Sequence, residues 1–194
     1  MRGASITALG ILLASTTLIG GEYAPSESVR LRPLQPIARK LVADGLKRST
    51  TIRQLADRLR GSDLIVYVEV RSDMSSQTAG SLRFIAPSAS DRFLRISLNR
   101  QYDWTTLIAL LGHELQHVSE VADAPEVRSP DALRRLYQRV GVRVGRDAYD
   151  SLEAQRTGRL VRTELRGGAA TLGGRRVSLD GILLGSGSIA AAAP

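Results

Sequence analysis

Hydrophobic and polar positions along the chain divide into helix-like and strand-like stretches, most clearly in its middle. Five stretches have apolar residues at helical spacing or are rich in helix formers: 34–47, 50–60, 104–123, 130–140 and 147–165. Three shorter stretches are rich in β-branched and other apolar residues and predict strands: 64–70, 81–86 and 92–99. Helices, then strands, then further helices predict an α+β domain with a small antiparallel or mixed sheet.

Several helix boundaries are signalled by residues that satisfy the free backbone groups of a helix end. Ser49 and Asp103 precede the second and third predicted helices as N-caps, and Ser129 precedes Pro130 at the start of the fourth. Ala124-Pro125 predicts the end of the third helix, and Gly141 that of the fourth. These signals place the helix around residue 113 within well-defined limits.

The two ends of the chain differ from this middle. Residues 4–20 are apolar or small, and no acidic or basic residue follows Arg2 until Glu22, which predicts a signal peptide or N-terminal membrane anchor over residues 1–24. Residues 167–194 are rich in glycine and alanine and predict a flexible tail, with one short strand considered at 175–179. One domain is expected over residues 28–166. Its expected location is outside the cytoplasm: periplasmic, secreted or anchored at the outer face of a membrane.

The formal net charge of +8 arises from 25 arginines and 2 lysines against 19 acidic residues. The arginines are spread over most of the predicted helices, and aromatic residues make up only 4% of the chain, so no specific nucleic-acid partner is expected. Attraction to an anionic membrane or to cell-envelope polymers is consistent with this charge. The absence of cysteine excludes disulfides and cysteine metal ligands.

Both histidines of the chain lie in the pentapeptide His113-Glu114-Leu115-Gln116-His117. This is the H-E-x-x-H pattern, in which two imidazoles bind one metal ion and the glutamate acts on a water molecule. The spacing suits this chemistry because residues i and i+4 lie on one helical face, one turn apart. The pattern predicts a zinc site with His113 and His117 as ligands and Glu114 as general base.

The helix from Gly112 to His117 resembles the active-site helix of zincin-type metallopeptidases. The third histidine of the metzincin pattern is absent, because positions 120 and 123 hold Glu120 and Asp123. The third protein ligand is then a carboxylate, and the chain resembles the gluzincins, whose third ligand is a glutamate on a later helix. The resemblance implies a zincin-like fold, a zinc-dependent peptidase activity, and a sheet-edge role for the strand at 92–98 in pairing with extended substrate.

Three carboxylates are candidates for the third ligand. Glu153, on the predicted helix 147–165, fits the gluzincin arrangement best, and a surface ion pair with Arg156 is its alternative reading. Glu120 lies one turn beyond His117 and could bind the metal or support a histidine. Asp123, at the end of the same helix, is the third candidate and is also typical of a residue that orients a ligand.

The chain departs from the gluzincin pattern four residues after Glu153, where Thr157 replaces the aspartate that orients a ligand histidine in many members. Glu120, Asp123 and Asp150 are left as alternatives for that role. The sequence alone does not decide between them.

Both histidines are assigned to the metal, so neither is left to donate a hydrogen bond to the developing oxyanion. Tyr149, one helical turn before Glu153, is the candidate of choice, followed by Tyr137 and Arg156. A tyrosine packed beneath the site is the structural alternative for Tyr149.

The sequence therefore favours an exported zinc metallopeptidase that hydrolyses peptide or protein substrates. Zinc with three protein ligands lowers the pKa of its bound water to about 7, and Glu114 would take the proton and pass it to the leaving amine. One alternative is a catalytically silent metal-binding or structural module that acts through partner binding. Another is a basic surface-binding protein in which the motif is incidental.

Overall fold

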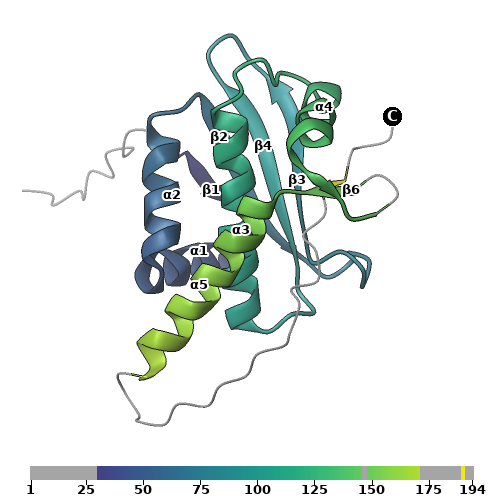
Figure 1. Cartoon of the computed structure of the whole chain (residues 1–194). Coiled ribbons are helices and arrows are strands. Elements are labelled where there is room, and N and C mark those ends of the chain that lie inside the picture. The colour runs from purple at the N-terminus through teal and green to yellow at the C-terminus, as the bar shows by residue number, and fades with distance from the viewer. Residues whose placement is uncertain (1–29, 146–147, 171–188, 191–194) are drawn as a thin grey trace, which may run out of the picture.

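The computed structural model describes residues 30–145, 148–170 and 189–190 (Figure 1). Its elements are, in chain order, β1 (Leu31–Pro33), α1 (Pro36–Arg48), α2 (Thr50–Arg60), β2 (Leu64–Arg71), β3 (Gly80–Pro87), β4 (Arg92–Asn99), α3 (Trp104–Ala122), α4 (Pro130–Val140), β5 (Val142–Arg143), β6 (Ala148–Asp150), α5 (Leu152–Ala170) and β7 (Ile189–Ala190). The predicted signal or anchor segment and the stretch 175–179 lie outside the described residues. Among the described helices, none combines the length and apolar character needed to cross a bilayer.

The main sheet has four strands in the order β1-β2-β4-β3. Strands β1, β2 and β4 run parallel, and β3 runs antiparallel to β4, so the sheet is mixed and the α+β prediction is confirmed. The expectation that the strand at 92–98 forms a sheet edge is wrong, because β4 is paired on both sides. The edges are β1 and β3. Strand β4 lies between β2 and β3 in the sheet, although it follows β3 in the sequence. The order of the strands along the chain does not predict this crossover.

Helices α1, α2, α3 and α5 form a helical layer on one face of this sheet, in which α1 and α3 contact the strands and α2 and α5 pack against α3 (Figure 1). The strand side chains that face the layer are fully buried: Leu64, Val66, Val68, Leu82, Leu94, Ile96 and Leu98. Helix α3 lies at the centre of the layer, and 13 of its 19 residues are buried. Because α3 is enclosed to this extent, its two histidines are also withdrawn from water.

Three of the predicted helix caps are confirmed. The backbone N–H groups of Ile52, Thr106 and Ala132 donate to the side chains at the three predicted N-cap positions, with distances of 3.1, 3.0 and 3.1 Å. Helices α2, α3 and α4 consequently begin at the residues that the cap signals predict. Each cap satisfies a backbone donor that has no partner within the helix.

Helices α3 and α5 approach each other closely beside the motif. A Cβ atom at Gly112 would lie 2.6 Å from Val161 Cγ2, so only glycine allows this crossing without displacing one of the helices. Val161 itself is fully buried. Since Gly112 immediately precedes His113, the crossing holds the middle of α5 close to the motif.

The predicted helix over 147–165 is wrong at its beginning. Residues Ala148–Asp150 form β6, which pairs antiparallel with β5 on one side and β7 on the other. Helix α5 begins only after Ser151, whose hydroxyl accepts a hydrogen bond from the Ala154 N–H at 3.0 Å. A serine at the N-cap favours extended backbone at its own position, which separates the strand from the helix.

Arg92, at the start of β4, is the largest fully buried side chain among the described residues. Its Nε and Nη2 atoms donate to the two Asp63 carboxylate oxygens, both at 2.7 Å. Its Nη1 donates to the backbone carbonyls of Val121, Ala124 and Val127 at 2.8–3.2 Å. The guanidinium thereby links the end of α3 and the segment that follows it to the start of β4.

Candidate metal centre

Helix α3 presents both histidines inside the protein. His113 is 2% exposed and His117 is fully buried. Their rings lie one turn apart with centroids 4.9 Å from each other, in an edge-to-face arrangement. The prediction that the two imidazoles share one helical face is confirmed.

The third residue of the cluster is Asp150, the last residue of β6. Its Oδ1 atom lies 3.2 Å from His113 Nε2 and 3.3 Å from His117 Nε2. Ligands placed tetrahedrally at about 2.0–2.1 Å from a cation are about 3.3–3.4 Å from one another. The observed spacing fits this value, and the buried group His113, His117 and Asp150 could hold a metal ion.

The ligand atoms are short of partners. His113 Nε2, His117 Nε2 and Asp150 Oδ1 are all buried and make no hydrogen bond of good geometry within the described structure. Burial of this kind costs free energy unless another group compensates, and a cation at the common centre would do so. The donor set of two imidazoles and one carboxylate is suited to divalent transition metals, including zinc.

The electrostatics of the cluster favour a positive charge at its centre. Burial opposes the charged form of His117, but Asp150 and Glu120 outweigh burial and raise the pKa of His117 to about 9. Burial likewise acts to raise the pKa of Asp150, but the two imidazoles hold that pKa below its ordinary value. In the absence of a metal ion, a proton on His117 therefore supplies positive charge at this position.

Glu114 lies beside the cluster without binding anything. Its side chain is fully buried, and neither carboxylate oxygen has a hydrogen-bond partner in the part of the chain that the structure describes. Burial raises the pKa of this carboxyl above its ordinary value, although the two histidines act in the opposite direction. A Cβ atom at Gly80, the first residue of the edge strand β3, would lie 2.5 Å from Glu114 Oε1. The glycine thus leaves the space that this carboxylate occupies.

Glu120 supports His117 from the side away from Asp150. Its Oε2 lies 3.0 Å from His117 Nδ1, and its Oε1 accepts a hydrogen bond from Ser151 Oγ at 2.5 Å. A carboxylate on Nδ1 fixes the tautomer that leaves the Nε2 lone pair free for a cation. The sequence predicts that Glu120 either binds the metal or supports a histidine, and this geometry fits the second role.

Tyr137, on α4, also contacts this histidine from behind. Its hydroxyl donates to the backbone carbonyl of His117 at 3.0 Å, and its ring packs edge-to-face on the imidazole. The tyrosine is fully buried, and burial raises its pKa well above the ordinary value. A neutral Tyr137 held in this way positions α3. Its hydroxyl is engaged by the His117 carbonyl, so Tyr149 stays the preferred candidate for the oxyanion donor.

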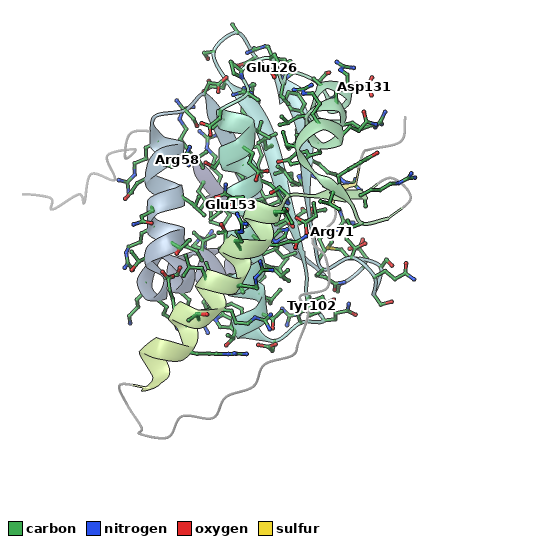
Figure 2. The ribbon with its side chains drawn as sticks, viewed as in Figure 1. Arg58, Arg71, Tyr102, Glu126, Asp131 and Glu153 are labelled. Atoms are coloured by element: carbon green, nitrogen blue, oxygen red, sulfur yellow. The ribbon has the colours of Figure 1, made fainter. Side chains whose placement is uncertain are left out.

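Other predicted site residues lie elsewhere. Glu153 is exposed on α5 (Figure 2) and forms the ion pair with Arg156, 3.2 Å apart. The carboxylate that the structure groups with the two histidines is that of Asp150. Asp123 is exposed and paired with Arg58 of α2, away from the histidines. Tyr149 is half-buried on β6 and packs against the core, and its role as an oxyanion donor stays a prediction.

The signal that identifies Asp150 was present in the sequence at the next residue. Ser151 is a good N-cap, and a helix that begins after it leaves Asp150 in an extended segment that points back to α3. A single helix over 147–165 instead favours Glu153, which is the second residue of α5. The physical difference between the two carboxylates is burial: Asp150 is enclosed and Glu153 is exposed.

Comparison of the chain with protein-family models, with curated proteins and with solved structures gives no match. The chemistry of this cluster is therefore inferred from its own residues.

Proposed function

We propose that the protein is a zinc-dependent hydrolase that cleaves peptide bonds. The observation that carries the proposal is a buried Glu114 carboxylate, without a hydrogen-bond partner among the described residues, beside the metal-ligand group in which Asp150 Oδ1 lies 3.2 and 3.3 Å from the two histidine Nε2 atoms. A purely structural metal site needs the three ligands and has no use for the glutamate. A hydrolytic site needs both.

The same donor set of two histidines and one carboxylate also suits non-haem iron. Glu114 favours the hydrolytic reading, because a proton acceptor of this kind belongs to water activation. Zinc is preferred for the same reason: it activates water without redox chemistry.

Each protein group has a distinct task in the proposed reaction. The metal ion, when bound, supplies a Lewis acid that makes water acidic and polarises a carbonyl group. Glu114 takes the proton from the attacking water on a carboxylate oxygen and delivers it to the nitrogen of the leaving amine. The raised pKa of its buried carboxyl suits a group that must both accept and release a proton. Glu120 holds His117 in the tautomer that the ligand role requires.

The location expected for this activity is outside the cytoplasm, on the basis of the apolar segment at residues 4–20. The substrate is a peptide or protein. A catalytically silent metal-binding module is the alternative, and the substitution Glu114→Gln separates the two, since such a module would lose nothing by it.

The test uses the full-length chain and the matched carboxylates Asp150 and Glu153. Metal content by mass spectrometry is expected to be about one zinc ion per chain in the wild type, strongly reduced in Asp150→Asn and unchanged in Glu153→Gln. Glu114→Gln is expected to retain the metal and lose at least about 100-fold in peptidase activity, in line with removal of a general base.

Three results would contradict the proposal. A folded wild type that takes up no divalent metal removes the metal site. Equal metal loss in Asp150→Asn and Glu153→Gln removes the assignment of the third ligand. Metal-dependent peptidase activity that survives Glu114→Gln removes Glu114 as the general base.

A further inference from the structure

The sheet has a second face, opposite the helical layer, and it carries a row of arginines. Arg32 of β1 lies opposite Tyr67 of β2, Tyr67 lies opposite Arg95 of β4, and Arg95 lies opposite Arg83 of β3. Residues in direct register point to the same face of a sheet. Since strands are about 4.8 Å apart, the row crosses all four strands over about 14 Å.

Two of these arginines lack acidic partners. Among the described residues, neither Arg83 nor Arg95 forms an ion pair, although they are directly opposite each other. Like charges in this position destabilise a strand pair. The Nε atom of Arg95 is in addition buried without a hydrogen-bond partner. The fold therefore bears an electrostatic cost here, and an external anion would relieve it.

The acidic groups of this face are committed to other residues. Glu69 accepts a hydrogen bond from Ser97 at 2.7 Å and lies 3.5 Å from Arg71. Asp91 is paired with Arg30. The positive charges of Arg83 and Arg95 consequently remain available to a partner.

Two aromatic residues border the row. The rings of Tyr67 and Phe93 are nearly parallel, with centroids 6.4 Å apart and planes at 14°. Because the rings pack on each other, they do not stand as separate platforms on which bases would stack. Aromatic side chains beside arginines are typical of a surface that meets lipid headgroups.

The N-terminal sequence points to the same partner. The apolar stretch at residues 4–20 ends ten residues before Leu31, the first residue of β1. Ten residues span at most about 35 Å, so a membrane that receives this stretch lies within reach of the edge of the arginine row. We propose that the sheet face formed by Arg32, Arg83 and Arg95 docks on an anionic lipid surface through phosphate headgroups.

The proposal is tested by sedimentation of the full-length protein with vesicles of phosphatidylcholine alone and with vesicles that contain phosphatidylglycerol. The preference for anionic over neutral vesicles is the readout, because any insertion of the N-terminal stretch contributes to both. The double substitution Arg83→Gln/Arg95→Gln is expected to reduce this preference about 10- to 30-fold. Thermal unfolding checks its fold.

The matched control is Arg134→Gln/Arg139→Gln on α4, which removes the same charge from residues paired with Asp131 and Glu126. It is expected to reduce the preference by less than about 3-fold. An equal loss in both double variants would show a general charge effect and overturn the proposal, as would a wild type without preference for anionic vesicles. Binding of single-stranded oligonucleotide through Arg83 and Arg95, without lipid preference, would assign the face to nucleic acid instead.

Discussion

The protein buries two clusters of charged side chains that are built in opposite ways. Around Arg92, all three guanidinium nitrogens donate hydrogen bonds, to Asp63 and to three backbone carbonyls. Around His113 and His117, the nitrogens that face Asp150 have no such partners, and neither have the oxygens of Glu114. The first cluster is complete within the chain. The second is completed only by something added to it.

This difference distinguishes structural from functional burial. An unpaired buried polar group costs about 1–3 kcal/mol, and more when it is charged, so several of them side by side are retained only where they serve a purpose. The cation in the Arg92 cluster is part of the protein. In the histidine cluster, three buried side chains are grouped so that they could hold a metal ion.

Substitution of Arg92 is expected to have the largest effect on stability. In Arg92→Met the packing volume is largely kept, but Asp63 and three carbonyls lose their donor, and unfolding in urea should show a loss of about 3–5 kcal/mol. Metal content should be unchanged if the protein is assayed while folded. Arg58→Met is the control, because that arginine forms an exposed pair with Asp123 and should cost less than about 1 kcal/mol. Similar losses in the two variants would mean that the buried network adds nothing.

Glu120→Ala is expected to have an intermediate effect, on the metal affinity of the histidine cluster. The substitution leaves the metal ligands in place but removes the support of His117 Nδ1, so metal affinity should fall about 10- to 100-fold. A competition titration with a metal indicator measures this change. Asp123→Ala, three residues later on an exposed position, should leave the affinity unchanged. A loss in both variants, or in neither, would remove the supporting role of Glu120.

Glu114→Gln is expected to have the smallest effect on stability, and in the opposite direction. Replacing a buried, unpartnered carboxylate by a neutral amide should stabilise the metal-free protein by about 1 kcal/mol, because less charge is withdrawn from water. Urea unfolding in the presence of a chelator provides the measurement. Glu69→Gln is the matched control: that buried carboxylate is bonded to Ser97 and lies near Arg71, and its loss should destabilise. Destabilisation in both variants would show that Glu114 is held by interactions like those of Glu69.

Much of the fold follows from local sequence signals. The caps at Ser49, Asp103 and Ser129 define the starts of three helices, and the pattern of strand residues predicts β2, β3 and β4 closely. These features depend on neighbours within a few residues. For the same reason, the two histidines and Glu114 were identified from their spacing alone.

The features that the sequence did not reveal depend on distant contacts. Asp150 belongs to the cluster because β6 pairs with β5 and β7 and because α5 crosses α3 at Gly112. Glu153 has the right residue type and a plausible distance along the chain, but its position on α5 faces away from α3. The pairing of β4 with β2, and with it the arginine row, likewise joins segments that only the sheet brings together.

The origin of Asp150 in a late segment has a consequence for how the protein matures. His113 and His117 leave the ribosome well before Asp150, and the strand that carries Asp150 is set in place by α5, which docks against Gly112. A chain that is still being made therefore holds two of the three side chains of the cluster. If the cluster binds a metal ion as proposed above, binding follows completion of the domain, and the proposed peptidase activity is absent until then.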